Sequence, residues 1–449
     1  MPFNYVTVTA SSELFAPATR AFGDILVLGK GAVGRGATTA RSFTYPGKAV
    51  EAYPKGATTL AAKADKAATT VTAAASFPVG TRVRIGEGEE AEYLTIKSVA
   101  EVEGGGGGEG PGEVSSFTWT LEAALAADHP SGDPLVWEKP NDVAAAIATA
   151  FRQTPPPTRV WGIEVDPADP DWDTAFTEAE DLPVQILVLA NTPLNGNPAT
   201  DHPVELLAKH VVDVSNTGGD GKERIGVAAL DPGEAQSAQV KRNAGAIKTD
   251  RMVLVAHKES QDDVAAAVAG VIAGHEPHIS LLLKPINMGM SGLFTATEIE
   301  TYYTNSINWV TSPVMLPGHG LYLGEGLTAS PAGNKAYVDI VRTLDDISFR
   351  IKAALIEAIG DIRIDRPGLR TVVTLVQSVL SPLVTRDVIE EYVIHIPLLV
   401  LLEREPATLA PDEVKQIGNG RSTRSVDMEV SVVYAGVIHQ IAVKLALKG

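Results

Sequence analysis

The sequence predicts a multidomain protein that combines α/β and α+β architecture. Between residues 140 and 316, apolar strands alternate with amphipathic helices, a pattern typical of a mostly parallel sheet covered on both faces. Residues 51–139 carry short alternating strands without a long helical pattern, which predicts a small β-rich insert. Residues 317–449 carry two long amphipathic helices followed by strands, so an α+β unit is expected there.

Length and composition limit the classes of protein that the chain can represent. Its 449 residues leave room for roughly three domains, and 45% hydrophobic and 20% charged residues are typical of a folded chain. The net charge of -18 disfavours binding to nucleic acid or to anionic membranes. The absence of cysteine excludes disulfides, thiol nucleophiles and Cys-ligated zinc.

The sequence shows no targeting segment. Residues 1–5 offer neither a basic nor an apolar region of the kind that opens a secretory signal. The longest apolar runs, residues 264–272 and 396–402, fall short of the roughly 18 residues needed to cross a bilayer. We therefore expect a soluble chain that is made in the cytoplasm and does not insert into a membrane.

The first 139 residues are expected to be mainly extended. Residues 5–9 alternate as a strand does, and residues 25–28 are apolar at every position, as in a buried strand. In the insert, three further strands are predicted, with a glycine run at 104–108 between the last two; they cover residues 82–85, 92–96 and 117–121. Residues 139–142, Lys-Pro-Asn-Asp, mark a boundary that caps a new helix.

The rest of the chain divides into the α/β region and the C-terminal unit. In the α/β region, strands are predicted at 159–165, 184–189, 224–230, 251–256 and 279–283, and helices at 143–152, 173–180, 204–214, 233–244 and 262–273. In the C-terminal unit, helices are predicted at 339–359 and 369–383, and strands at 392–402, 426–433 and 438–447.

One motif suggests a cofactor. Residues 29–34 read Gly-Lys-Gly-Ala-Val-Gly, a G-x-G-x-x-G pattern directly after the predicted strand 25–28. Dinucleotide binding requires a helix next, whereas residues 35–47 show no helical period and end in Pro-Gly. A glycine-rich turn is the better interpretation, and a doubly wound nucleotide-dependent enzyme that uses this loop is kept as the alternative.

Other candidate chemistry is weak. Pro277 prevents His275 and His278 from sharing one helical face as metal ligands. Ser291 lies in a near match to a nucleophile elbow, but Leu293 replaces the second glycine. We predict no catalytic, cofactor or metal site, and hence no cofactor.

Three stretches resemble contractile tail sheath proteins of phages and injection systems. Residues 318–328 and 337–347 resemble a glycine-flanked strand followed by a "Y-[IV]-x-[VI]-x-R" segment and a long helix. Residues 425–439 resemble the closing strands of the same family, and residues 25–53 resemble its opening strand and turn. The resemblance implies a structural protein and not an enzyme.

The resemblance also implies an organisation of domains. An inner domain would combine residues 1–50, including an N-terminal arm, with residues 317–449, including a C-terminal arm. Residues 140–316 would form the α/β domain, called subtilisin-like in sheaths for its fold alone, and residues 51–139 would be a decoration. The arms would add strands to neighbouring subunits, and the alternative is terminal strands that fold back on their own subunit; the arm residues are Tyr5, Val6, Val8, Val430, Val432, Ile438, Ile441 and Val443.

The function implied is that of a subunit that polymerises around an inner tube and contracts to drive it through a target envelope. The helix 339–359 would face the tube, unless its charges only meet water; the residues are Asp345, Asp346, Arg350 and Lys352. The partners would be copies of the chain in stacked, hexameric rings, an inner tube protein, and baseplate and terminator proteins. Another virion or surface-layer structural protein is the second alternative.

Overall fold

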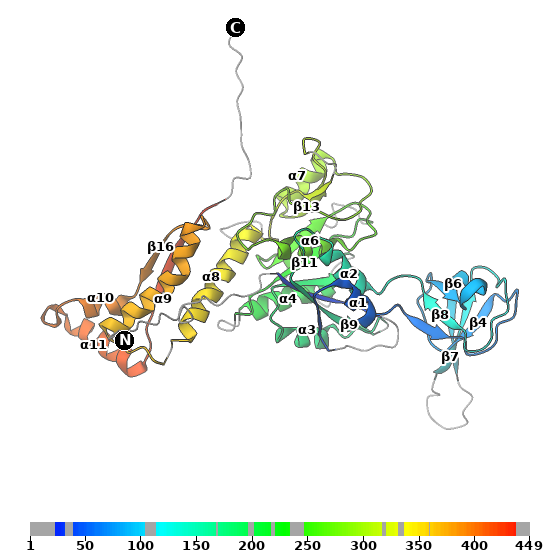
Figure 1. Ribbon diagram of the computed structural model, residues 1–449, viewed down its shortest axis with the longest axis horizontal. Helices are drawn as coiled ribbons and strands as arrows, with labels where there is room; N and C mark the ends of the chain where they lie inside the picture. Colours follow the sequence, from blue (N-terminus) through cyan, green and yellow to red (C-terminus); the bar gives the residue numbers. More distant parts are fainter. Residues whose placement is uncertain are drawn as a thin grey trace, which may run out of the picture.

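The computed structural model describes residues 23–31, 39–103, 114–167, 169–195, 202–216, 221–233, 247–316, 320–330, 336–358 and 360–436. Three parts follow one another along the long axis of the molecule (Figure 1). A small β-structure lies at one end, a large sheet with its helices lies in the middle, and a helical part lies at the other end.

The middle part is built on a nine-stranded sheet in which six neighbouring strands are parallel. In sheet order its strands are β13 (Pro285–Ile286), β15 (Leu321–Leu323), β14 (Asn308–Thr311), β12 (Met252–Ala256), β11 (Ile225–Ala229), β10 (Ile186–Ala190), β1 (Asp24–Lys30), β9 (Arg159–Val165) and β2 (Arg41–Phe43). At one side of the sheet, β13 pairs antiparallel with β15, and β15 pairs antiparallel with β14. At the other side, β2 pairs antiparallel with β9. The protein is thus a mixed α/β protein with a large mixed sheet.

Helices cover both faces of this sheet because its strands alternate their side chains between the faces. Ile25 and Val27 of β1 belong to one core, with α1 (Pro46–Ala52), α2 (Asp142–Phe151) and α6 (Val264–Gly274). Leu26 and Leu28 belong to the opposite core, whose helices are α3 (Trp172–Glu180), α4 (Pro203–Ser215) and α7 (Ala296–Thr304).

The place of β1 corrects the predicted domain division. Residues 1–50 were assigned to an inner domain with residues 317–449, but β1 lies in the middle of the large sheet, where Ile25 is level with Val160 of β9 and Ile186 of β10. Such a strand is buried on both faces, which explains why it is apolar at every position from 25 to 28. The sheet also extends past residue 316, because β15 pairs with β14.

The small part is a closed β-structure. Its strands are β3 (Ala57–Thr59), β4 (Thr70–Ala73), β5 (Arg82–Ile85), β6 (Glu92–Glu103), β7 (Val114–Leu121) and β8 (Pro134–Trp137). The strand order is β3-β8-β5-β6-β7-β4, and an antiparallel bridge between Leu60 and Ala73 joins the first strand to the last. We call this part the barrel; its core is its own and is centred on Trp119 and Phe77, whose rings lie 5.1 Å apart.

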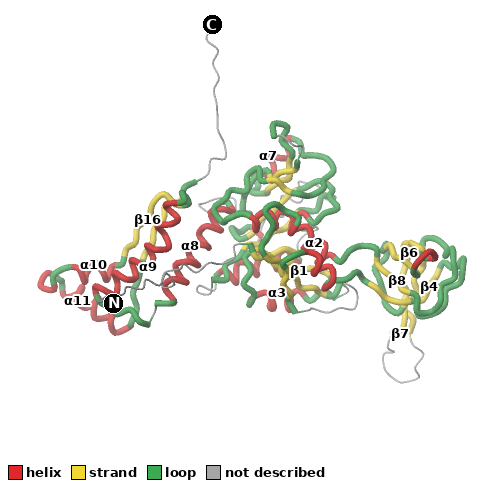
Figure 2. Tube along the Cα trace, in the orientation of Figure 1, coloured by secondary structure: helices red, strands yellow, loops and turns green. Residues whose placement is uncertain are grey.

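The C-terminal part contains two long helices, two short ones and a two-stranded sheet (Figure 2). The elements are α8 (Val338–Ile356), α9 (Arg366–Thr385), β16 (Ile389–His395), α10 (Pro397–Glu403), α11 (Pro411–Thr423) and β17 (Glu429–Tyr434). Ile347 of α8 packs with Val376, Leu380 and Leu383 of α9 in a core shared with the sheet.

One predicted strand is correct only in part, and another is wrong. The strand predicted at 392–402 ends at His395, because Pro397 cannot donate a hydrogen bond to a ladder and instead opens α10. Residues 279–283 form a turn in which Leu283 has a positive φ of 55°, and only Pro285–Ile286 is a strand. Most of the helix predicted at 233–244, and the strand predicted at 438–447, lie outside the described residues.

Among the described residues, α9 alone is long and apolar enough to cross a membrane, with a mean hydropathy of 1.2. Its apolar side chains Leu369, Val376 and Leu380 are buried, whereas its exposed face carries Thr374 and Gln377. This division is that of an amphipathic helix that packs on a protein core.

Candidate assembly surfaces

In the described residues, side chains of the protein occupy the crevice where a doubly wound sheet would bind a ligand. Such sheets bind ligands at the carboxyl ends of the strands where the strand order reverses, which here means the end of β1. A Cβ on Gly31 would lie 1.8 Å from Cγ of Glu164, and a Cβ on Gly29 would lie 2.6 Å from Cβ of Ala190. Glu164 is fully buried and accepts a hydrogen bond from Nδ2 of Asn141 at 2.7 Å. These glycines therefore provide room for protein side chains.

The helix N-termini at this crevice are capped by the protein. The side chain of Asn141 accepts from the N–H of Val143 at 3.0 Å, as the capping prediction for residues 139–142 expected. Asp263 caps α6 and also accepts from the N–H of Asn191 at 2.7 Å. Burial raises the pKa of Asp263. The N–H groups of Val143 and Ala266 at the starts of α2 and α6 thus already have acceptors, whereas residues 32–34 of the glycine loop lie outside the described residues.

The other candidate reactive residues make structural contacts. Nδ1 of His275 lies 2.8 Å from the carbonyl oxygen of Val271. The hydroxyl of Ser291 donates to the carbonyl oxygen of Glu259 at 3.3 Å. In the described ranges, no group of three or more His, Cys, Asp or Glu side chains could hold a metal ion.

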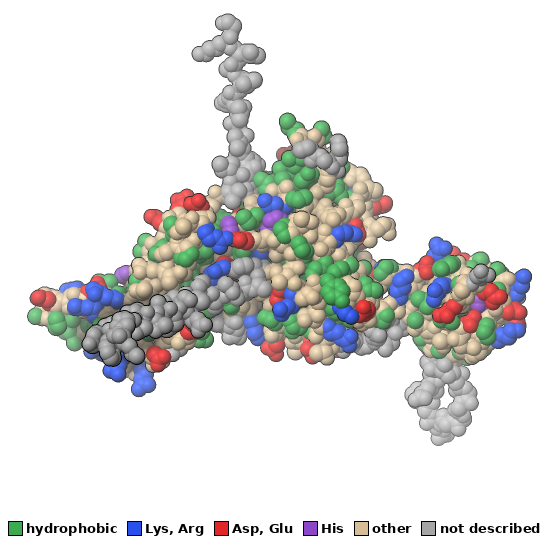
Figure 3. Space-filling model, in the orientation of Figure 1, with side chains coloured by type: hydrophobic (Ala, Val, Ile, Leu, Met, Phe, Trp, Pro, Cys, Tyr) green, Lys and Arg blue, Asp and Glu red, His purple; other side chains and the backbone are tan. Residues whose placement is uncertain are grey.

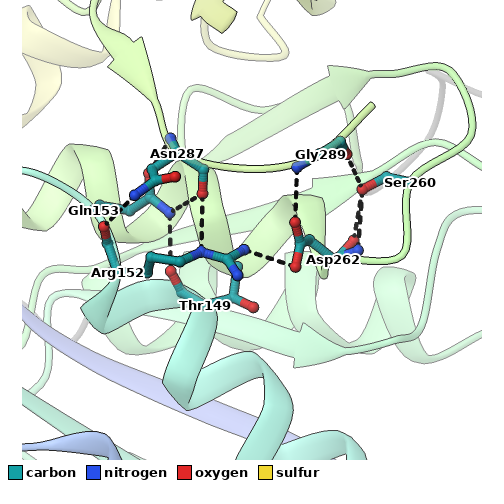
Figure 4. A network of polar contacts seen from close by, with 7 residues as sticks. All are labelled: Thr149, Arg152, Gln153, Ser260, Asp262, Asn287 and Gly289. Carbon is teal, nitrogen blue, oxygen red and sulfur yellow. Dashed lines mark hydrogen bonds and ion pairs between the residues drawn. The ribbon is translucent and has the colours of Figure 1, made fainter. Parts of the chain in front are cut away.

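A polar network holds the chain segment that follows β13, at the edge of the large sheet (Figure 4). Gln153, just beyond α2, donates from Nε2 to the carbonyl of Asn287 at 3.0 Å and accepts the N–H of Asn287 at 2.8 Å. Arg152 pairs with Asp262 at 2.7 Å, and Asp262 also accepts the N–H of Gly289 at 2.8 Å. The segment after β13 is therefore tied to α2 and to the start of α6.

The four charged residues predicted to face a tube make ion pairs within the subunit. Asp345 forms a bidentate ion pair with Arg251, in which Nη2 of Arg251 donates to Oδ1 of Asp345 at 3.0 Å. Asp346 pairs with Arg350 at 2.9 Å, and Lys352 pairs with Glu223 at 2.8 Å. Two of these pairs join α8 to the sheet domain. Contact of these residues with an inner tube stays a prediction, and it would compete with the internal pairs.

The end of β17 is also tied to α8. The hydroxyl of Tyr434 lies 2.8 Å from Oδ2 of Asp339 and 3.2 Å from the carbonyl oxygen of His278. Burial, together with the negative charge of Asp339, raises the pKa of Tyr434 above its ordinary range. The small sheet is thereby fixed to the rest of its own subunit.

The two-stranded sheet presents edges for further strands. β16 and β17 pair antiparallel from Ile389 with Tyr434 to His395 with Glu429, and in the described part of the chain they form a sheet of two strands only. Val430 and Val432 pack against the core that α8 and α9 share, whereas the side chains of Val393 and Val433 are exposed.

In the single subunit the two arm residues in β17 lie in a strand that pairs with β16; their exchange with a neighbouring subunit stays a prediction. The remaining predicted arm residues, Tyr5, Val6, Val8, Ile438, Ile441 and Val443, lie outside the described residues. The sequence analysis predicted residues 392–395 as part of a strand but did not identify β16 as an edge strand.

Comparison of whole folds identifies the architecture. A scan against protein families and a search of curated proteins found no match to the sequence. The structure is similar to the anti-feeding prophage helical sheath in its contracted state, with a TM-score of 0.58 over 99% of both chains at 11% sequence identity. The chain has the fold of a contractile sheath protein.

Two further solved structures support this sheath fold. A chain of the anti-feeding prophage baseplate, 6-fold symmetrised, has a TM-score of 0.54 at 12% identity, over 100% of this chain and 99% of that one. A chain of the same baseplate in its contracted state has a TM-score of 0.54 at 10% identity, over 100% and 97%. The resemblance predicted from the sequence is confirmed at the level of fold.

Proposed function

We propose that the chain is a structural subunit of a contractile sheath, which polymerises around an inner tube and contracts to drive the tube through a target envelope. The observation that carries the proposal is the two-stranded sheet β16–β17, which belongs to a sheath fold and leaves both outer edges without partners in the described part of the chain. The filled crevice at the end of β1 favours this proposal over a nucleotide-dependent enzyme.

Assembly would proceed by strand addition. Arms from neighbouring subunits, formed by residues near the two chain ends, would pair with the outer edges of β16 and β17. Main-chain hydrogen bonds would supply the strength of this link, and the chain that leads to each arm would let subunits reorient without separating. The partners would be copies of the chain in stacked hexameric rings, a tube protein and baseplate proteins.

The extended lattice would store free energy, and contraction would release it without breaking a covalent bond. The extended lattice would be metastable, and a contracted packing with more contacts between subunits would be the lower state. A trigger at the baseplate would start the change, which moves the tube. The particle would be assembled from chains made in the cytoplasm.

Negative-stain electron microscopy of the purified chain, with and without its tube protein, tests the proposal. We expect hollow, helically striated cylinders. Removal of residues 1–22 should abolish the cylinders while the circular dichroism spectrum is retained, because the sheet β16–β17 would lose an added strand. A matched control, removal of residues 104–108 between β6 and β7, should leave assembly unchanged.

Two results would overturn the proposal. Monodisperse particles under every condition would exclude a sheath and call for calorimetry with nucleotides at the glycine loop. Flat lattices would favour a surface-layer protein instead.

A further inference from the structure

A groove lies beside the start of β17, between the two short helices of the C-terminal part. It has a volume of about 310 Å³ and is formed by α10, α11 and the chain that leads into β17. Its lining includes Leu398, Leu401, Asn419, Gly420, Val426 and Asp427. A cavity of about 150 Å³ already holds a benzene molecule, so the groove has room for two apolar side chains.

The helix that forms one wall of the groove is apolar but is not buried. All residues from Leu398 to Leu402 are apolar, and no residue of α10 is buried. Val400 is 47% exposed, and Val414 of α11 is 53% exposed. α10 and α11 lie together at the end of the molecule opposite the barrel (Figure 1), and apolar side chains are exposed there (Figure 3). Single exposed apolar side chains are common, whereas a whole apolar helix without burial indicates a surface that another segment covers.

Polar contacts hold α10 against the start of α9. Nη2 of Arg366 donates to the carbonyl of Leu402 at 2.8 Å. Arg370, one turn further along α9, pairs with Glu403 at 2.9 Å. This wall of the groove is therefore in place before anything binds, and a preformed site loses little conformational entropy on binding.

The predicted C-terminal strand ends in side chains that suit an apolar groove. Leu445 and Leu447 are two positions apart, so in a strand both point to the same face. A strand that runs antiparallel to β17 brings its own C-terminal end to the start of β17, where the groove lies. In strand addition, main-chain hydrogen bonds supply affinity, and pockets for alternate side chains supply specificity.

Charge distinguishes the two ends of the chain as occupants. Residues 437–449 contain two lysines and no acidic side chain, so they are basic. Residues 1–22 contain one acidic and one basic side chain, which cancel. Asp427 lines the groove, Glu429 follows two residues later, and both are exposed. This acidic rim favours the C-terminal segment.

The chain leaves β17 without the turn that would return it directly to the same copy. A two-residue hairpin between Tyr434 and Val437 needs a positive φ at Ala435, or at both Ala435 and Gly436. Neither residue has one. The hydroxyl of Tyr434 also lies 2.8 Å from Oδ2 of Asp339, which fixes the end of β17. A tight return onto the same β17 is therefore excluded, which favours a second copy as the partner.

We propose that Leu445 and Leu447 of one copy of the chain dock in the groove between α10 and α11 of a neighbouring copy. The inference rests on the proposed sheath function and deepens it, because it adds a side-chain anchor to the main-chain pairing of an arm. Two leucine side chains bury far less than the roughly 1,200 Å² of a stable standard interface. The anchor therefore fixes the register of an added strand and does not by itself hold two copies together.

Binding of a peptide tests the groove without assembly. A fluorescent peptide with the sequence of residues 437–449 should bind the full chain saturably, as measured by anisotropy below the concentration at which cylinders form. The peptide with Leu445→Ser and Leu447→Ser should bind at least about tenfold more weakly, because two buried apolar side chains are lost. A matched peptide with Ala442→Ser and Ala446→Ser, at positions of the opposite face, should bind as the natural sequence does.

Variants of the chain identify the groove as the site. Leu401→Ser, in the lining, should weaken binding of the natural peptide at least about tenfold. Val400→Ser is the matched control, because Val400 lies on the same helix but outside the lining, and it should leave binding unchanged. Circular dichroism and the melting temperature of both variants report whether the fold is retained.

Disulfide cross-linking tests the contact between copies, since the chain has no cysteine of its own. In cylinders of the double variant Asn419→Cys with Leu447→Cys, oxidation should produce a ladder of covalent multimers, because each copy would link to two neighbours. Val79→Cys with Leu447→Cys should give no ladder, because Val79 is exposed on the barrel, at the other end of the molecule.

The outcomes separate this inference from the proposed function. A natural peptide that does not bind, or that binds equally well without its leucines, overturns the docking. Tighter binding of a peptide of residues 1–22, or a cross-link that closes within one chain or reaches the tube protein, also overturns it. Failure of the unmodified chain to form cylinders overturns the proposed function, whereas leucine-dependent binding of the peptide would still establish the groove as a site between copies.

Discussion

At the scale of single residues, the sheet domain contains a buried cation with an unusual set of partners. Arg224 is fully buried, and its guanidinium donates to the carbonyls of Ala179 at 2.8 Å and Leu182 at 3.1 Å. Nε2 of His210 lies 3.3 Å from the same guanidinium. Burial, and next the charge of Arg224, lower the pKa of His210 to about 3. The imidazole therefore stays neutral in the folded protein.

This depressed pKa predicts a loss of stability in acid. Below about pH 6.5 the unfolded chain binds a proton at His210, whereas the folded chain keeps this imidazole neutral until the pH nears 3. The free energy of unfolding therefore decreases as the pH falls from about 6.5 toward 3. Between pH 7 and 4.5 the contribution is about 2 to 3 kcal/mol. In urea unfolding between pH 7 and 4.5, the free energy of unfolding should fall by about 2 to 3 kcal/mol more for the wild type than for His210→Gln. The amide oxygen of the glutamine can still accept a hydrogen bond from Arg224.

A surface histidine provides the control. His395→Gln, at the exposed end of β16, should show the wild-type pH dependence. Parallel curves for the wild type and His210→Gln would contradict the assignment of a neutral, buried imidazole.

At the scale of elements, α8 shows how ion pairs can fix one part of the molecule on another. Asp345 and Arg251 are separated by 94 residues, and their side chains are 14% and 13% exposed. Burial lowers the pKa of Arg251, but Asp345 more than compensates and raises it above its ordinary value. Asp345→Asn should cost about 3 kcal/mol of unfolding free energy, because it leaves a mostly buried guanidinium without its carboxylate.

Chemical denaturation and limited proteolysis would measure this loss. Glu51→Gln is the matched control, because it breaks the exposed pair with Lys48 and should leave the free energy of unfolding nearly unchanged. Equal stability of Asp345→Asn and Glu51→Gln would show that the pair does not fix α8.

Local patterns predicted the elements whose signals are local. The strand at 159–165 and the helix at 173–180 follow directly from their apolar periods. Pro397 ended a predicted strand because the apolar run around it fits a helix equally well. The central position of β1 was missed because pairing with β9, more than a hundred residues later, leaves no mark within the strand itself.

The same limit applies to the candidate surfaces. The two-residue period of β17 correctly predicted that its two faces differ, and one face is half-buried, but it could not identify the partner, which is the core of α8 and α9. Likewise, the charges of α8 were visible in the sequence, whereas Arg251 and Glu223 became their partners only through the fold.

At the scale of the whole molecule, the described residues attach the barrel to the sheet domain where the chain enters and leaves it. The N–H of Trp137 donates to the carbonyl of Gly56 at 2.8 Å, so the chain enters and leaves the barrel side by side. Nζ of Lys55 donates to the carbonyl of Glu138 at 2.9 Å at the same junction. The barrel lies at the opposite end of the molecule from β16 and β17 (Figure 1). It is therefore distant from the edges that the proposed arms would use.

This arrangement predicts that the barrel can be removed without loss of assembly. Replacement of residues 56–137 by a short Gly-Ser linker closes two ends that already touch, so the entropic cost of the new loop is small. The barrel core around Trp119 is separate from the cores of the large sheet, so neither loses its packing. The shortened chain should keep a cooperative melting transition and form cylinders by electron microscopy, and residues 56–137 alone should unfold cooperatively with a shift in Trp fluorescence. Aggregation of both pieces would instead make the barrel part of the folding core of the sheath subunit, a result that would require contacts beyond the single junction.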